Sequence, residues 1–158
     1  MGSWTLFAGV VRPKSRGQIR LTGPAPQDPL QINPNTLSDP DDLKATIASV
    51  RLCREIGNSP PLRPFVKREV APGNLKGPAL EDFIRDAAIS YAHQASTARM
   101  GRDEMSVVDG RLKVYGIDNL RIADASIMPR VTTGNTMAPC IVIGERAGEI
   151  LKMAHGIS

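Results

Sequence analysis

Three short stretches carry the side chains of this sequence that could do chemistry: 91–101 (YAHQASTARMG), 123–126 (ADAS) and 133–139 (TGNTMAP). The first holds His93, one of only two histidines, and imidazole is well suited to act as a general base near neutral pH. The second histidine, His155, stands near the C-terminus, where we expect a solvated helix end. A histidine just past a helix is also commonly a structural hydrogen-bonding residue, so spacing alone leaves both roles open for His93.

The third stretch leads into a predicted helix. Gly134, Asn135 and Thr136 come directly before it, at the end where free backbone N–H groups and the positive end of the helix dipole converge. Such a place stabilises an anion, including one that develops only during a reaction. A simple Asn or Thr cap would explain the same residues, and this alternative stays open.

The first part of the chain is expected to hold a β-hairpin. Alternating apolar residues predict a strand over 4–11, a turn over 12–17 and a second strand over 18–22. Four prolines in 23–37 predict an ordered but irregular crossing.

Helical spacing of apolar residues predicts three helices, over 38–57 with Ser38 as N-cap, 78–91 and 137–154. Two loops, 92–110 and 124–136, precede and follow two short predicted strands, 112–115 and 120–123. In the last helix Gly144 and Gly148 lie one turn apart, which predicts close packing against a sheet.

The totals limit the class of protein. The chain has 158 residues, 41% apolar and 23% charged, which is the balance of a globular domain. The net charge of +4 is scattered, so we expect no nucleic-acid partner. Cys53 and Cys140 are far apart and form no metal motif, so we expect buried, reduced thiols and no metal site. No membrane-length apolar run or signal peptide is seen, and we expect a cytoplasmic protein.

Several segments together resemble the glucose–methanol–choline (GMC) oxidoreductase family. His93–Gly101 resembles the family's H-P-x-G-T-x-x-M-G signature. Three further segments follow family patterns in the same order, namely Ser106–Gly116 (SVVDGRLKVYG), Asn119–Pro129 (NLRIADASIMP) and Gly134–Pro139 (GNTMAP). Upstream, RPKSRG at 12–17 and NPNTLSDP at 33–40 also look like family segments, so the likeness covers nearly the whole chain.

The resemblance implies an enzyme that oxidises an alcohol by passing hydride to FAD. By that resemblance, His93 takes the hydroxyl proton and Asn135 hydrogen-bonds the same oxygen. Asp124 and Ala125 match residues along the flavin's ribityl and pyrophosphate region. Asn135, Thr136 and Met137 match the loop and helix start beside the flavin ring, where the helix dipole suits the charge of the reduced flavin.

Three residues depart from the family pattern. Gln94 stands where the family usually has Pro, so we expect a less rigid turn. Ser96 stands in place of a usual Gly, which argues against a positive φ there. Met137 replaces the second Asn of G-N-T-N-A-P and removes a polar side chain but no backbone N–H.

The nucleotide-binding motif G-x-G-x-x-G is absent from the sequence. We therefore expect the C-terminal part of an FAD-dependent alcohol oxidoreductase, needing an N-terminal FAD-binding portion as partner and inactive and flavin-free alone. The expected class is α+β. Residues 1–91 would form part of the substrate-domain sheet with its helices, and residues 92–158 the active-site loops and the last strand and helix of the FAD-binding domain. The alternative is a non-catalytic, partner-binding domain that keeps this fold.

Overall fold

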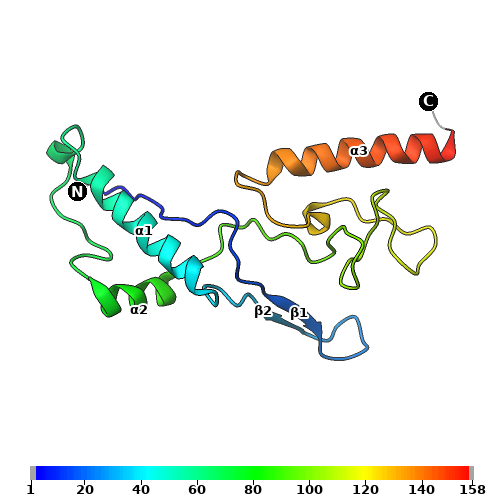
Figure 1. Cartoon of the computed structure of the whole chain (residues 1–158), viewed down its shortest axis with the longest axis horizontal. Helices are drawn as coiled ribbons and strands as arrows, with labels where there is room; N and C mark the ends of the chain where they lie inside the picture. The colour runs from blue at the N-terminus through cyan, green and yellow to red at the C-terminus, as the bar shows by residue number, and fades with distance from the viewer. Residues whose placement is uncertain (1–2, 157–158) are drawn as a thin grey trace. The chain divides into compact units, whose positions relative to one another are not determined.

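The structure, a computed structural model, describes residues 3–156 and combines helices with a small sheet, which confirms the α+β class. The chain forms two compact units, Met1–Ile89 and Ser90–Ser158, and each is described by itself below (Figure 1).

The sheet of the first unit is an antiparallel hairpin of β1 (Gln18–Leu21) and β2 (Leu30–Asn33), shown in blue in Figure 1. The predicted strand at 18–22 is present, but it pairs with β2 and not with the predicted partner, 4–11. β2 lies inside the stretch expected to be irregular. The reason is local: 30–33 is a proline-free run between Pro29 and Pro34, so its N–H groups can pair with β1.

The predicted strand over 4–11 is absent, because this segment lies along a helix instead of beside a strand. It has no regular structure, and the N–H of Gly9 donates to Ser49 Oγ at 3.2 Å. The side chains of Trp4 and Leu6 pass over Gly57, where a Cβ would lie 3.6 Å and 3.9 Å from them. Trp4 and Leu6 therefore lie against a helix surface, while Phe7 on the other face is 75% exposed.

The N-cap of helix α1 (Pro40–Gly57) lies one residue later than predicted. Asp39, not Ser38, is the N-cap, and its carboxylate accepts a hydrogen bond from the N–H of Asp41 at 2.8 Å. Asp42, only 4% exposed, accepts from the N–H of Lys14 at 2.9 Å and of Ser15 at 2.7 Å. The start of α1 thus holds the 12–17 turn in place.

Helix α2 (Gly77–Ala87) packs against α1. The buried core of this unit consists of Leu37, Leu43, Leu80 and Ile84. α2 ends four residues before the predicted Tyr91. The chain leaves the core of this unit there, and Ile89 is 81% exposed.

A second feature of α1 orders the Pro- and Gly-rich connection to α2, which contains the short 3-10 helix η1 (Arg63–Phe65). Arg54 pairs with Glu69, with Nε 3.0 Å from Oε1, and its Nη2 donates to the carbonyl of Gly73 at 2.8 Å. One guanidinium therefore ties a long loop to the helix.

The second unit has a core of its own, made by Val108, Leu112, Ile127 and Ala147. The two short strands predicted at 112–115 and 120–123 are reduced to isolated bridges, Val108 with Val114 and Lys113 with Arg121. Tight turns on either side leave too few residues for a longer ladder. A short 3-10 helix, η2 (Ala125–Ile127), follows.

Helix α3 (Met137–His155) closes the chain and ends at Gly156, whose φ of 62° is the left-handed conformation usual after a helix. A Cβ added at Gly144 or Gly148 would meet nothing within 4 Å, so the predicted close packing of these glycines against a sheet is absent from the described residues. Cys53 and Cys140 are unpaired, but they are half-buried where full burial was predicted.

Candidate active site

The His93 loop is held by local hydrogen bonds around Ser90. The Ser90 hydroxyl accepts from the N–H of Ala92 at 3.0 Å and from the side-chain amide of Gln94 at 2.7 Å. Ala92 adopts a positive φ of 56°, which turns the chain sharply just before the histidine. Gln94, which departs from the family pattern, therefore supplies a side-chain tie across this turn.

The His93 ring lies between two residues from the start of α3. Its Nε2 is 3.1 Å from Asn135 Oδ1, and its Nδ1 is 3.3 Å from Thr136 Oγ1. His93 and Thr136 are half-buried, while Asn135 is exposed. Residues 42 positions apart in sequence thus share one small polar cluster that solvent can reach.

The start of α3 leaves its backbone donors uncapped. The first helical hydrogen bond runs from the N–H of Cys140 to the carbonyl of Thr136 at 3.0 Å, and no side chain of the described residues caps the helix. The N–H groups of Met137 and Ala138 belong to the first turn, which has no intrahelical partners. They therefore form a set of donors next to the His93–Asn135 pair.

Backbone hydrogen bonds join the loop that follows His93 to the segment that follows Asp124. The N–H groups of Ser96, Ala98 and Met100 donate to the carbonyls of Ala125, Ser126 and Ile127 at 3.3, 3.0 and 2.7 Å. Asp124 is the exposed N-cap of η2, and its Oδ1 accepts from the N–H of Ser126 at 2.7 Å. Its other carboxylate oxygen makes no hydrogen bond within residues 3–156 and could accept one from a bound group.

Ser96 adopts a φ of 75°, against the sequence expectation that serine would avoid it. The N–H of Ser96 donates to the carbonyl of Ala125 in this conformation, so the backbone bond helps to offset the strain of its Cβ. The loop thereby stores a small strain next to the histidine.

Three of the predicted site residues, His93, Asn135 and Thr136, are in direct contact. Ala125 meets the His93 loop through its carbonyl, which accepts from the N–H of Ser96, and Asp124 directly precedes it in sequence. The Met137 side chain is 73% exposed and its backbone N–H is the group that could contribute. One neighbour was missed: the Tyr91 ring lies edge-to-face with His93, with ring centroids 5.3 Å apart. No sequence signal pointed to this contact, because it depends on the turn that Ala92 makes at φ 56° between the two rings.

The salt bridge between Arg99 and Asp103 closes the loop that follows. A hydrogen bond from the Arg99 guanidinium lowers the pKa of Asp103, and the same bond raises the pKa of Arg99. The pair lies at the surface, where solvent screens it, so it contributes little to stability.

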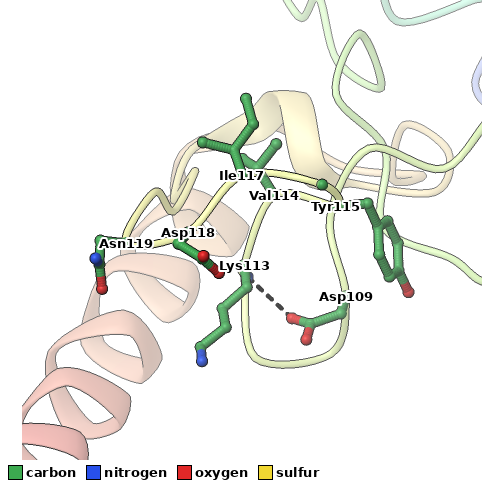
Figure 2. A pocket seen from close by; sticks show the side chains of 8 residues that line it. Asp109, Lys113, Val114, Tyr115, Ile117, Asp118 and Asn119 are labelled. Carbon is green, nitrogen blue, oxygen red and sulfur yellow. Dashed lines mark hydrogen bonds between the residues drawn. The ribbon is translucent and has the colours of Figure 1, made fainter.

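A separate hollow in the second unit, shown in Figure 2, contains none of the predicted site residues. It is formed by the turn from Asp109 to Asn119, in which the backbone N–H of Lys113 donates to the Asp109 carboxylate at 2.9 Å.

Among residues 3–156, no group of three or more His, Cys, Asp or Glu side chains is placed to hold a metal ion. In the same range, no helix is long and apolar enough to span a lipid bilayer.

Comparison with known proteins identifies the family. The family model described as GMC oxidoreductase matches residues 13–144, which is most of the chain. This chain belongs to the GMC oxidoreductase family and corresponds to its C-terminal region.

Individual relatives agree with that membership. The chain is 44% identical to an alcohol dehydrogenase [acceptor] of Pseudomonas putida, over 94% of this chain and 27% of that protein. It is 39% identical to the mitochondrial choline dehydrogenase of Mus musculus, over 95% of this chain and 26% of that protein. The solved structure of an FAD-dependent oxidoreductase from Chaetomium thermophilum superposes with a TM-score of 0.83 at 34% identity, over 93% of this chain and 26% of that chain. The chain thus spans about a quarter of the length of these relatives.

Proposed function

We propose that this chain supplies the proton-handling half of the active site of an FAD-dependent enzyme that oxidises the CH–OH group of an alcohol. The observation that carries the proposal is the contact between His93 and Asn135 at the uncapped start of α3. The family membership and the alcohol-oxidising relatives support it.

The donors and acceptors of the second unit fit a flavin. The unpaired N–H groups of Met137 and Ala138 suit an electron-rich ring edge, and Gly134 has open space around its Cα. The free oxygen of Asp124 suits the hydroxyls of a ribityl chain. Asn135, Thr136, Met137, Asp124 and Ala125 would hold the cofactor, which when bound supplies the hydride acceptor.

Each residue has one task in the proposed reaction. His93 accepts the proton of the substrate hydroxyl at Nε2, acting as general base. The Asn135 side-chain amide hydrogen-bonds the same oxygen and keeps it beside the ring. The N–H groups at the start of α3 stabilise negative charge that develops nearby during the reaction.

The chain spans about a quarter of its relatives and carries no dinucleotide motif. We therefore propose that an N-terminal portion of the same protein holds the nucleotide end of FAD, and that this chain alone is inactive. The choice of alcohol would depend on both portions.

A hybrid protein tests the proposal. In the Pseudomonas putida alcohol dehydrogenase, the matching segment is replaced by this chain, and the flavin absorbance is followed without oxygen. We expect primary or secondary alcohols to reduce the bound flavin, and tertiary alcohols, which have no hydrogen on the carbinol carbon, to leave it oxidised. A hybrid that binds flavin but is reduced by no alcohol of a broad panel contradicts the proposal.

A further inference from the structure

Thr136 does not do what its position predicts. Threonine directly before a helix usually accepts a hydrogen bond from a backbone N–H of the first turn. Here the residue has φ −79° and ψ −8°, a helical conformation, and its side chain makes no capping bond. Its hydroxyl oxygen instead lies 3.3 Å from Nδ1 of His93. The Thr136 hydroxyl therefore contacts the histidine and does not cap the helix.

The two partners of the His93 ring differ in chemistry. Asn135 can present either its amide oxygen or, after a half-turn of the amide, its NH2 group to Nε2. The Thr136 hydroxyl can accept a proton from Nδ1 or donate one to it. The ring is therefore paired at both nitrogens in either neutral tautomer. Only the tautomer with hydrogen on Nδ1 has a lone pair on Nε2, and a substrate hydroxyl can use it when the Asn135 amide turns from the ring to the substrate oxygen.

We propose that Thr136 is a positioning residue that favours this tautomer: its Oγ1 accepts the Nδ1–H bond and holds the ring with Nε2 toward the substrate oxygen. The inference rests on the proposed role of His93 as base. When the substrate O–H bond breaks, its proton forms a bond to Nε2, and the Nδ1 proton stays on the ring. Thr136 Oγ1 then accepts a charge-assisted hydrogen bond from the imidazolium.

The tautomer can be measured directly in the 158-residue chain by 15N NMR of its imidazoles, because there are only two histidines. In the neutral rings, we expect Thr136→Val to raise the fraction of the Nε2–H form of His93 relative to wild type. Thr136→Ser, which keeps the hydroxyl, should retain the wild-type ratio. His155, far along α3, serves as an internal control and should not change. An equal tautomer ratio in wild type and Thr136→Val overturns the inference.

A helix-capping role for Thr136 predicts a different result. Loss of a cap would lower the thermal midpoint of the valine variant and leave the His93 tautomer unchanged, which also overturns the inference. If Thr136→Val does not fold, Thr136→Ala tests the same hydroxyl with a smaller side chain.

The hybrid enzyme gives a second readout. We expect Thr136→Val to slow flavin reduction by roughly tenfold, as is usual when the partner that orients a functional histidine is lost, with little change in the alcohol concentration for half-maximal rate. Thr136→Ser should restore the rate. If the wild-type hybrid is not reduced by alcohol, the proposed function fails, while the NMR comparison still decides the Thr136–His93 contact.

Discussion

At the scale of single residues, the site depends on two residues whose positive φ is unfavourable for a residue with a Cβ. His93 follows Ala92 at φ 56° and precedes Ser96 at φ 75°. For residues with a Cβ, this region costs roughly 1–2 kcal/mol. The chain accepts that cost because the three backbone bonds from 96–100 to 125–127 fix the loop beside η2. Positive φ at Ser96 is thus part of how the histidine is placed.

Replacing Ser96 by glycine should stabilise the second unit. Glycine removes the Cβ strain, and after its larger loss of backbone entropy on folding we expect a net gain of about 0.5–1 kcal/mol. Ser96→Ala is the matched control, since it removes the hydroxyl and keeps the Cβ. Urea unfolding measures both variants. Equal stabilisation by alanine and glycine would show that the backbone is not the cause.

At the scale of elements, α1 anchors the 12–17 turn through one buried carboxylate. Burial raises the pKa of Asp42, but hydrogen bonds from the Ser15 hydroxyl and from the N–H groups of Lys14 and Ser15 outweigh burial and hold it below its ordinary value of 3.8. A carboxyl with a lowered folded pKa stabilises the fold fully above that ordinary value. Its contribution is lost as the pH falls through the folded pKa.

Asp42→Asn should therefore destabilise the first unit by about 2–3 kcal/mol at neutral pH, because an amide replaces an acceptor that faces hydrogen-bond donors. The variant should also lose part of the stability difference between neutral and acidic solution. Asp41→Asn is the control: Asp41 lies on the same turn but is exposed, so its change in stability should be much smaller. Urea unfolding at several pH values checks this. Equal effects of the two substitutions would contradict the assigned role.

The sequence predicted those elements whose signals are local. The helical spacing of apolar residues such as Leu43 and Ile47 places the predicted start of α1 within two residues of the observed start. The apolar residues that follow Met137 do the same for α3. The partner of β1 was not predictable in this way, because the 4–11 segment has the alternation of a strand but packs on α1. Which segment pairs with β1 depends on contacts between residues far apart in sequence, and a local pattern does not contain them.

The same contrast applies to the site. The resemblance drew attention to His93 and Asn135, and the structure brings their side chains within hydrogen-bonding distance. The Thr136–His93 contact and the Tyr91 ring needed coordinates, because each depends on a rotamer and a turn angle. The roles of these residues in catalysis remain predictions.

At the scale of the whole molecule, α3 presents an apolar stripe that the described residues do not cover. Ile141 is 57% exposed and Leu151 is 41% exposed, with Gly144 and Gly148 between them on the same side of the helix. Exposed apolar residues that share one side of a helix are a common feature of interfaces. We propose that the FAD-binding portion covers this stripe, where the two glycines would allow close approach.

Gly148→Leu tests that interface. In the 158-residue chain we expect a gain of about 0.5–1 kcal/mol, because leucine favours a helix and a Cβ at 148 meets nothing within 4 Å. In the hybrid, the same side chain should clash with the covering portion and lower the flavin content. Glu149→Leu, on the polar side of α3, is the control. Normal flavin content in the Gly148→Leu hybrid would contradict coverage of the stripe.

The central claim is that His93 handles the proton of the alcohol, and one variant tests it most directly. In the hybrid enzyme, His93→Ala should slow flavin reduction by alcohol by roughly 10²–10⁴-fold, the usual contribution of a general base, while flavin content stays the same. His155→Ala removes the other histidine and should leave the rate unchanged. Stopped-flow measurement of flavin reduction gives both values. Equal rates for His93→Ala and wild type would contradict the account.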